Sequence, residues 1–236
     1  MNSNRQTQWL SKPFAITTRR LVIVPTPIAI SLESYRALYA ALHADVGFCE
    51  MGFGPDFPVK NWTDEETYEV IAARDIGRSW EKYAIGDFAV GLHSGSKQGI
   101  SGSSMLEGKG FEELAGEDLQ YFSDINWVGY AGIRDARTTS LPPREAGDPP
   151  LPPWQEMVEL RYGVSPKVWG KGMAKEAAEA VMKWAIEKRG VRRFIAETER
   201  DNVRSARLLQ KLGFVASGTD YWKEPNELEW ELVVNN

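Results

Sequence analysis

Two kinds of hydrophobic pattern divide the chain into predicted strands and helices. Short apolar runs bounded by turn residues are typical of strands, and apolar residues spaced three or four apart are typical of amphipathic helices. The first pattern predicts strands over residues 21–24, 88–93, 127–133, 157–164, 194–198, 214–222 and 228–234, the last two forming a hairpin. The second pattern predicts helices over residues 32–42, 63–76, 175–188 and 203–212.

Residues with capping preferences mark the ends of several of these helices. Ser31 precedes the first helix and is its predicted N-cap. Thr63 and Glu66 have the spacing of a capping box at the start of the second. Gly213 follows the last helix, where a left-handed C-cap is expected, and Phe214 supplies the apolar contact that accompanies such a cap.

Three segments lack these patterns. Residues 1–18 are predicted to be a polar tail, followed by a single domain over residues 19–236. Residues 94–126 are too many for a hairpin turn and are a predicted insertion, with a short ordered element over residues 111–122. Residues 138–153 hold six prolines, so this second insertion cannot be a regular helix or a central strand.

Composition narrows the classes of function. The chain has 236 residues, 42% of them hydrophobic and 26% charged, as in ordinary globular proteins. Its net charge of -5 disfavours general nucleic-acid binding, which needs a concentrated basic surface. No apolar run approaches the roughly 18 residues of a membrane span, no secretory signal is evident, and Cys49 is the only cysteine. We therefore predict a cytoplasmic protein with no membrane or nucleic-acid partner.

A turn with two glycines separates a predicted strand from the helix that follows it. Gly170 and Gly172 would let a phosphate approach the backbone, and the free N–H groups at a helix start attract anions. Lys167, Lys171 and Lys175 surround the turn with positive charge. The turn therefore predicts a diphosphate site; the alternative is an ordinary glycine-containing helix start with solvated lysines.

The known phosphate motifs narrow the choice further. The Walker pattern is excluded because Gly172 stands where Ser or Thr is required, and the dinucleotide fingerprint because Lys175 replaces its third glycine. The string Trp169-Gly-Lys-Gly-Met-Ala174 instead resembles the pyrophosphate loop of the GNAT superfamily of N-acetyltransferases. Its Trp-Gly-x-Gly start is similar to the RimJ/RimL branch, the ribosomal-protein N-terminal acetyltransferases.

A second block downstream matches the same superfamily. Asn202 and Ser205 have the family's Asn-x-x-Ser spacing, and the helix after them ends in Lys-Leu-Gly-Phe214. Taken alone, Asp201 or Asn202 is equally well explained as an ordinary helix cap. Together with the glycine turn upstream, in the same order of elements, the block supports the resemblance.

The resemblance implies a fold and a cosubstrate. The implied fold is the α+β GNAT fold, in which a mixed, mostly antiparallel central sheet carries helices on both faces and two central strands splay apart. Acetyl-CoA would lie between the splayed strands, and the strand before the turn would contact its pantetheine arm and polarise the thioester carbonyl. The implied cofactor-binding residues are Tyr162, Gly163, Val164, Lys167, Trp169, Gly170, Lys171, Gly172, Met173, Ala174, Lys175, Asn202 and Ser205.

Transfer to an amine also needs groups that move protons. Glu159 is the first candidate for the general base, since it alternates with Arg161 on the polar face of its strand; pairing with Arg161 or simple exposure is the alternative. Glu197 is the second candidate. Ser205 is the predicted donor to the coenzyme A thiolate, with a helix-capping role as its alternative and Tyr221 as a less secure donor. The two histidines match no family position, and we predict no catalytic metal.

These inferences define the predicted function and its rivals. The chain is predicted to transfer an acetyl group from acetyl-CoA to a primary amine, either a protein N-terminus or a small amine, by direct attack in a ternary complex, as a monomer or homodimer. We expect the two insertions to wall the acceptor side. One rival is a non-catalytic acyl-CoA-binding module. Another is an interaction protein with an exposed surface formed by Trp62, Trp80, Trp127, Trp154, Trp222 and Trp230.

Overall fold

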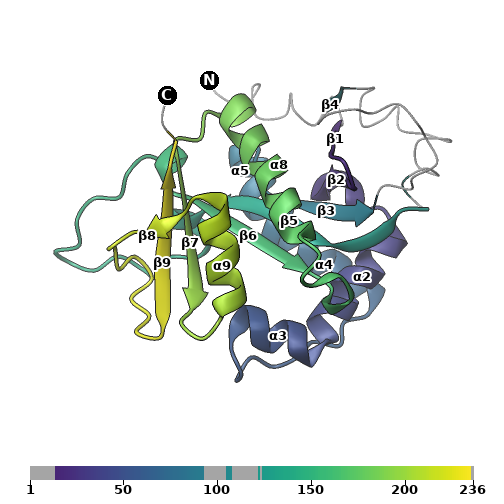
Figure 1. The fold of residues 1–236 in the computed structure, drawn as a ribbon, viewed down its shortest axis with the longest axis horizontal. Coiled ribbons are helices and arrows are strands. Elements are labelled where there is room, and N and C mark those ends of the chain that lie inside the picture. The colour runs from purple at the N-terminus through teal and green to yellow at the C-terminus, as the bar shows by residue number, and fades with distance from the viewer. Residues whose placement is uncertain (1–13, 93–104, 108–121, 123, 235–236) are drawn as a thin grey trace.

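The computed structural model of the chain describes residues 14–92, 105–107, 122 and 124–234 (Figure 1). Within these residues, nine strands form one sheet in the order β4-β1-β2-β3-β5-β6-β7-β9-β8. Neighbouring strands run antiparallel, except for β6 and β7, which run parallel. The sheet is therefore mixed and mostly antiparallel, as predicted.

The strands are β1 (Phe14–Thr17), β2 (Leu21–Pro25), β3 (Asp87–Leu92), β4 (Met105–Glu107), β5 (Asn126–Asp135), β6 (Val158–Val164), β7 (Arg193–Glu199), β8 (Val215–Ala216) and β9 (Glu227–Val233). The α-helices are α1 (Thr26–Ala29), α2 (Glu33–Ala44), α3 (Val46–Phe53), α4 (Asp64–Ile71), α5 (Glu81–Tyr83), α7 (Ala136–Thr139), α8 (Met173–Arg189) and α9 (Val203–Leu212). A π-helix, η1 (Ala72–Trp80), follows α4, and single 3-10 turns form η3 (Trp154–Glu156) and η4 (Pro166–Val168).

Helices cover both faces of the sheet (Figure 1). On one face, α8 lies across β2, β5 and β6, and its Val181 and Ala185 are fully buried in the larger core cluster. On the other face, α2 packs against β5, and Tyr35 belongs to a second core cluster. The two apolar clusters confirm the predicted layers, because each helix buries the stripe that its sequence period predicts.

The strands β6 and β7 separate part-way along their length. Their parallel pairing covers only two register positions and ends at Glu159 and Ile195. Beyond that point β6 remains paired with β5 as far as Val164, while β7 remains paired with β9 as far as Glu199. In the described part of the chain, the β7-facing edge of residues 160–164 has no strand partner, which confirms the predicted splayed pair.

The first of the predicted boundaries to need correction is the polar tail over residues 1–18. Its last part, Phe14–Thr17, forms β1, which pairs with β2 and β4, and Ala15 and Ile16 are buried. Four residues are too few for a period to be recognised, and the partner strand β4 lies far away in the sequence. Residues 1–13 lie outside the described residues.

The start of the first predicted helix is also wrong. Helix α2 begins at Glu33, after Leu32, and has no side-chain cap. Ser31 instead donates a hydrogen bond of 2.8 Å from its hydroxyl to the carbonyl of Ile28, at the end of α1. The sequence pattern missed α1 because it is a single buried turn with Pro27 near its start.

The second helix begins as predicted and then changes type. Thr63 and Glu66 form the reciprocal capping box, with backbone-to-side-chain bonds of 2.8 and 3.2 Å. After Ile71, however, the chain continues as the π-helix η1 up to Trp80. Such a long π-helical run is rare and is commonly associated with functional sites.

The end of the chain matches the prediction in part. Helix α9 has the predicted bounds, Gly213 has a left-handed φ of 94°, and Phe214 is buried. The predicted strand over residues 214–222, however, shortens to Val215–Ala216. The carboxylate of Glu229 accepts hydrogen bonds from the hydroxyl of Thr219 (2.5 Å) and the amide of Trp222 (2.8 Å), and these bonds hold the rest of the segment in a loop.

Of the two predicted insertions, residues 138–153 lie wholly within the described residues and residues 94–126 only in small part. Most of residues 94–126, including 111–121, lies outside the described residues. Residues 140–153 form neither helix nor strand, as the prolines predict, whereas residues 138 and 139 belong to α7.

Candidate functional site

A groove of about 620 Å³ opens where β6 separates from β7. It is bounded by the free end of β6, the glycine turn, the start of α8 and one face of α9. Of the predicted cofactor-binding residues, the groove is lined by Tyr162, Gly163, Val164, Trp169, Gly170, Gly172, Met173, Ala174, Lys175 and Ser205. Ten residues from three separate elements are therefore brought together as predicted.

The glycine turn has the backbone conformation that its sequence predicts. Gly170 and Gly172 have left-handed φ values of 74° and 78°, a region that side chains with a Cβ rarely occupy. Gly172 is the N-cap of α8, so the first N–H groups of that helix face the turn without intrahelical partners. This geometry fits an anionic group such as a diphosphate.

Residues outside the predicted site hold the turn in place. Arg20 donates to the carbonyl of Lys171 at 2.8 Å and to the carboxylate of Glu176 at 2.6 Å. The hydroxyl of Thr18 donates to the same carboxylate at 2.5 Å. A clamp from the turn between β1 and β2 therefore fixes the start of α8, and no signal in the sequence near the glycine turn indicates it.

The predicted basic residues are only partly in position. Lys175 lines the groove, but Lys167 and Lys171 do not, and the ammonium of Lys171 turns back onto the carbonyl of Lys167 at 3.0 Å. Positive charge comes instead from one face of α9, through Arg204, Arg207 and Lys211. Their spacing of three and four residues could have identified this face in the sequence.

Trp169 has a structural role within the turn. Its indole N–H donates to the carbonyl of Val164 at 2.8 Å, across the base of the turn. The guanidinium of Arg204 lies 5.0 Å from the centre of its ring, within the range of a cation–π contact. Trp169 thereby joins β6 to α9 on either side of the groove.

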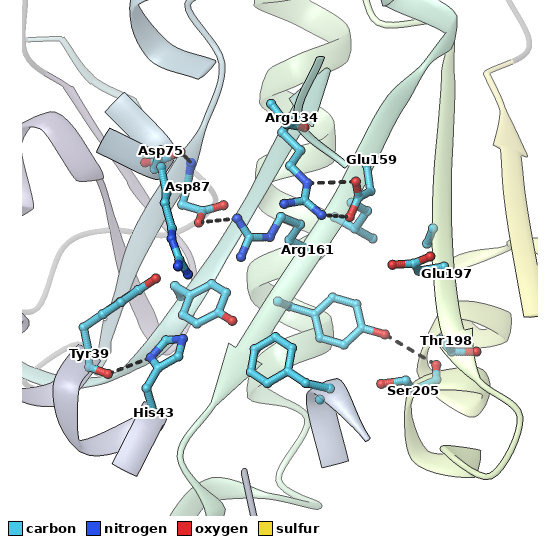
Figure 2. A pocket seen from close by; sticks show the side chains of 18 of the residues that line it. Tyr39, His43, Asp75, Asp87, Arg134, Glu159, Arg161, Glu197, Thr198 and Ser205 are labelled. Atoms are coloured by element: carbon cyan, nitrogen blue, oxygen red, sulfur yellow. Dashed lines mark hydrogen bonds and ion pairs between the residues drawn. The ribbon is translucent and has the colours of Figure 1, made fainter. Parts of the chain in front are cut away.

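A second cavity, of about 570 Å³, adjoins the groove (Figure 2). Both are lined by Gly52, Phe53, Tyr130, Tyr162 and Ser205, so the two spaces meet at the point where β6 and β7 part. The second cavity also contains both predicted general bases, Glu159 and Glu197. The site thus consists of two connected spaces. Of the two, only the second cavity is lined by carboxyl groups.

Glu159 is engaged with other side chains in this cavity. Its carboxylate accepts two hydrogen bonds from Arg134, of 2.6 and 2.8 Å, and another from the hydroxyl of Ser140. The predicted alternative partner, Arg161, instead pairs with Asp87 at 3.1 Å (Figure 2). Burial alone would raise the pKa of Glu159, but Arg134 and Ser140 together hold it below its usual value.

Glu197 lies in a contrasting environment across the cavity (Figure 2). Within the described residues, no group donates a hydrogen bond to Oε2 of Glu197 or of its neighbour Glu227. Burial raises the pKa of Glu197 well above its usual range, and hydrogen bonding with Glu227 and the negative charge of Glu159 raise it further. Glu197 therefore tends to hold a proton, as two adjoining carboxyl groups cannot readily both ionise.

The residues of the Asn-x-x-Ser block have different positions. Ser205 lines both spaces, and its backbone carbonyl accepts a 3.5 Å hydrogen bond from the hydroxyl of Tyr162. Asn202 lines only the second cavity, where its side chain caps α9 through the amide of Ser205 (3.0 Å) and donates to the carbonyl of Met51 (2.5 Å). Asn202 thus fastens α3 to α9, and the capping alternative describes its contacts better than cofactor binding.

Tyr221, the less secure proton donor, lies elsewhere. It packs beside a small core cluster with Trp222, and its ring lies 5.6 Å from the guanidinium of Arg193. It lines neither space.

A family model described as "Acetyltransferase (GNAT) domain" matches residues 29–215. The chain belongs to this family. The match covers most of the chain, including the glycine turn, α9 and both strands that part at the groove. Members of the GNAT family use acetyl-CoA as their acetyl donor, and the α+β GNAT fold predicted for the chain is the fold observed.

Two curated relatives match parts of this GNAT chain. The FsC-acetyl coenzyme A-N(2)-transacetylase of Aspergillus fumigatus is 32% identical over 87 residues, 37% of this chain and 37% of that protein. An uncharacterized N-acetyltransferase of Bacillus subtilis, YjdG, is 36% identical over 59 residues, 25% of this chain and 35% of that protein. The chain therefore matches little more than a third of the length of either relative.

Solved structures match over nearly the whole GNAT chain, at low identity. An acetyltransferase from Agrobacterium tumefaciens has a TM-score of 0.56 and 18% identity, covering 92% of this chain and 93% of that one. A putative ribosomal-protein-serine acetyltransferase from Vibrio cholerae has a TM-score of 0.53 and 15% identity, covering 93% and 97%. At these identities the likeness concerns the fold alone.

The GNAT site also contains a residue that matched no family position. His43 is buried, lines the second cavity and donates a 2.9 Å hydrogen bond from Nδ1 to the carbonyl of Tyr39. Burial lowers the pKa of His43, so the ring is favoured in its neutral form. It lies among aromatic rings, including Tyr39 and Tyr130, that also line the cavity.

The tryptophans do not form the exposed surface that the rival interaction hypothesis requires. Trp80, Trp127, Trp222 and Trp230 are buried, and Trp62 and Trp154 are half-buried. The surface on which that hypothesis was based is therefore not present among these residues. Among the helices of the described residues, none is long and apolar enough to cross a membrane.

Proposed function

We propose that this GNAT chain transfers an acetyl group from acetyl-CoA to a primary amine that binds in the second cavity. The observation that carries the proposal is the junction of the two spaces at Tyr130, Tyr162 and Ser205, where β6 and β7 part. A thioester in the groove and an amine in the cavity would meet there without a covalent enzyme intermediate. Such a ternary complex supports direct attack, since positioning the two reactants removes most of the entropic barrier.

The groove residues have distinct tasks in this proposal. Acetyl-CoA supplies a thioester whose acetyl carbon accepts the amine. The unpaired edge of β6 at Tyr162, Gly163 and Val164 would hydrogen-bond the pantetheine arm, in the manner of an added strand. The turn at Gly170–Gly172 and the start of α8 would bind the diphosphate, with Lys175 and the basic face of α9 adding positive charge.

Glu197 is the better supported of the two proposed general bases. A base for an ammonium group needs a carboxylate that is free to take a proton and a pKa raised toward that of the amine. Glu197 has the raised pKa and becomes a carboxylate with no salt-bridge partner once it ionises at higher pH, whereas Glu159 is held in its ionised form by Arg134. In the transfer step Glu197 first takes a proton from the ammonium group, the freed nitrogen lone pair bonds to the acetyl carbon, and the C–S bond breaks. The departing sulfur takes a proton from the hydroxyl of Ser205 or from water, and the second nitrogen proton restores that donor.

The type of reaction and the branch of the family rest on separate observations. The name of the Aspergillus relative, an acetyl coenzyme A-N(2)-transacetylase, supports acetyl transfer to nitrogen as the reaction. The RimJ/RimL-like branch rests on the string Trp169–Ala174 and on Glu176 and Ala177 after it. The cytoplasmic location and the choice between monomer and homodimer stay predictions from the sequence.

Binding and transfer can be tested separately. We expect acetyl-CoA at a hundredfold excess over its Kd to raise the Tm by about 5–10 °C, because a ligand of the folded state stabilises it by mass action. Adenosine should give a much smaller shift, since most proposed contacts are to the diphosphate and pantetheine. Scanning fluorimetry measures both, and an equal shift with adenosine would contradict the groove assignment.

Transfer is measured with radiolabelled acetyl-CoA and a panel of amines. We expect label to move to at least one primary amine, with release of one coenzyme A for each acetyl group transferred. Tight binding of acetyl-CoA without transfer to any amine would instead support the non-catalytic acyl-CoA-binding module.

A further inference from the structure

The charged groups of the second cavity divide into those that are already paired and those that are not. Arg161 is paired with Asp87, and Arg134 is paired with Glu159. Arg74 and Arg78 also line the cavity, and neither makes a hydrogen bond or ion pair with any described residue. Both are exposed, so they lie toward the solvent end of the cavity.

The π-helix explains why two unpaired guanidinium groups lie together here. Arg74 and Arg78 are four residues apart in η1, so they lie on the same side of the helix. Between them, Asp75 is buried and accepts hydrogen bonds from the hydroxyl of Thr26 (2.5 Å) and the amide of Asp87 (2.9 Å). These contacts anchor η1 against α1 and β3 and present Arg74 and Arg78 to the cavity.

The opposite wall carries two carboxyl groups that are not fully hydrogen-bonded. Glu197 on β7 and Glu227 on β9 each have a carboxyl oxygen with no donor among the described residues. Both line the same cavity as Arg74 and Arg78. The cavity therefore offers acceptors for an ammonium group on the β7 side and donors for an anion on the η1 side.

We propose that the acceptor is a small zwitterion of the α-amino-acid class, whose carboxylate binds Arg74 and Arg78 while its amine faces Glu197 and Glu227. This inference rests on the proposed acetyl transfer. Guanidinium groups bind carboxylates with two parallel hydrogen bonds, which also fixes the direction of the amine. A volume of about 570 Å³ is within the range of small-molecule sites. A protein N-terminus with an uncharged first side chain carries no carboxylate near its amine, so it would leave both arginines unused.

The test compares free L-amino acids with their carboxamides and with an unblocked tripeptide as acceptors. We expect kcat/KM to be higher for at least one free amino acid than for its carboxamide or for the tripeptide. The amine of a carboxamide loses its proton more easily, so intrinsic reactivity cannot produce this preference. In Arg74→Gln and Arg78→Gln, the KM for the free amino acid should rise about 10-fold, since a charge-assisted hydrogen bond is lost, while the KM for the carboxamide stays unchanged.

Arg19→Gln is the matched control, because Arg19 is exposed and lines neither space. It should leave all of these constants unchanged, and the acetyl-CoA Kd should be the same in all four proteins. A second measurement needs no turnover: with coenzyme A present, free amino acids should raise the Tm of wild type more than their carboxamides do.

The outcomes separate this inference from the proposed function. Transfer to carboxamides or peptides at rates equal to free amino acids, or an unchanged preference in the arginine variants, would overturn the zwitterion assignment and leave acetyl transfer intact. Absence of transfer to every amine would contradict acetyl transfer itself. The Tm comparison then tests only whether Arg74 and Arg78 bind a carboxylate. Equal shifts with amino acids and with carboxamides would overturn that assignment.

Discussion

Gly172→Val should lower the affinity for acetyl-CoA by at least about 100-fold, as two charge-assisted hydrogen bonds to the diphosphate would be lost. Gly172 has a φ of 78° at the N-cap of α8, where a β-branched residue is strained. A Cβ there would also lie 3.4 Å from the guanidinium of Arg20, which holds the turn through Lys171 and Glu176. Both effects displace the amides that would bind the diphosphate. Isothermal titration with acetyl-CoA measures the loss.

The other end of the same helix provides a matched control. Gly190 is the C-cap of α8, has a φ of 66°, and has open space where a Cβ would lie. Gly190→Val imposes a similar backbone strain of about 1–3 kcal/mol but lies away from both cavities. Its Tm should fall about as far as that of Gly172→Val, while its acetyl-CoA affinity stays that of wild type. If Gly172→Val and Gly190→Val bind acetyl-CoA with equal affinity, the glycine turn starts the helix but does not bind the diphosphate.

The sequence predicts those parts of the site whose conformation depends on residues close together in the chain. The glycine turn, α9 and its cap at Gly213 each depend on residues within about one helical turn of one another. Their backbone conformations follow from residue type, because only glycine adopts a left-handed φ at little cost. The splayed strands followed from the family resemblance, since no residue pattern marks the position where pairing stops.

The parts that the sequence does not predict depend on contacts between distant segments. Arg20 reaches Glu176 across 156 residues, and Asn202 reaches Met51 across 151. The same applies to Glu159, whose polar neighbour on its own strand, Arg161, is the wrong partner. The correct one, Arg134, lies opposite Glu159 on β5, a register that the long insertion conceals.

The contrast between Glu159 and Glu197 shows why a base is hard to choose from sequence. Glu159 alternates with apolar residues at the start of β6, and this periodicity ranks it first, whereas Glu197 lies past the middle of β7 between Ala196 and Thr198. Their protonation depends on what faces them: a guanidinium in one case, a second carboxyl group in the other. Glu227 comes from a strand that is 30 residues away in sequence, and its position is set by the pairing of β9 with β7.

That contrast predicts opposite effects of two substitutions on one pH profile. In wild type, the raised pKa of Glu197 keeps it protonated at neutral pH, so kcat/KM should rise with pH as Glu197 ionises. Glu197→Gln should lower kcat by about 100-fold or more and remove the limb of the profile that belongs to this group. The acetyl-CoA Kd should not change, because Glu197 does not line the groove.

Glu227→Gln should shift the same limb to lower pH and increase activity at neutral pH. Replacing Glu227 removes a hydrogen-bonding carboxyl group and a negative charge that both raise the pKa of Glu197. Ionisation of the acceptor amine also produces a rising limb, but that limb cannot move when only the enzyme is altered. Glu199→Gln is the control, since Glu199 lines the same cavity and neutralising it tests for a general loss of negative charge. If Glu159→Gln, rather than Glu197→Gln, removes the limb, and Glu227→Gln leaves it in place, the general base is Glu159 despite its pairing with Arg134.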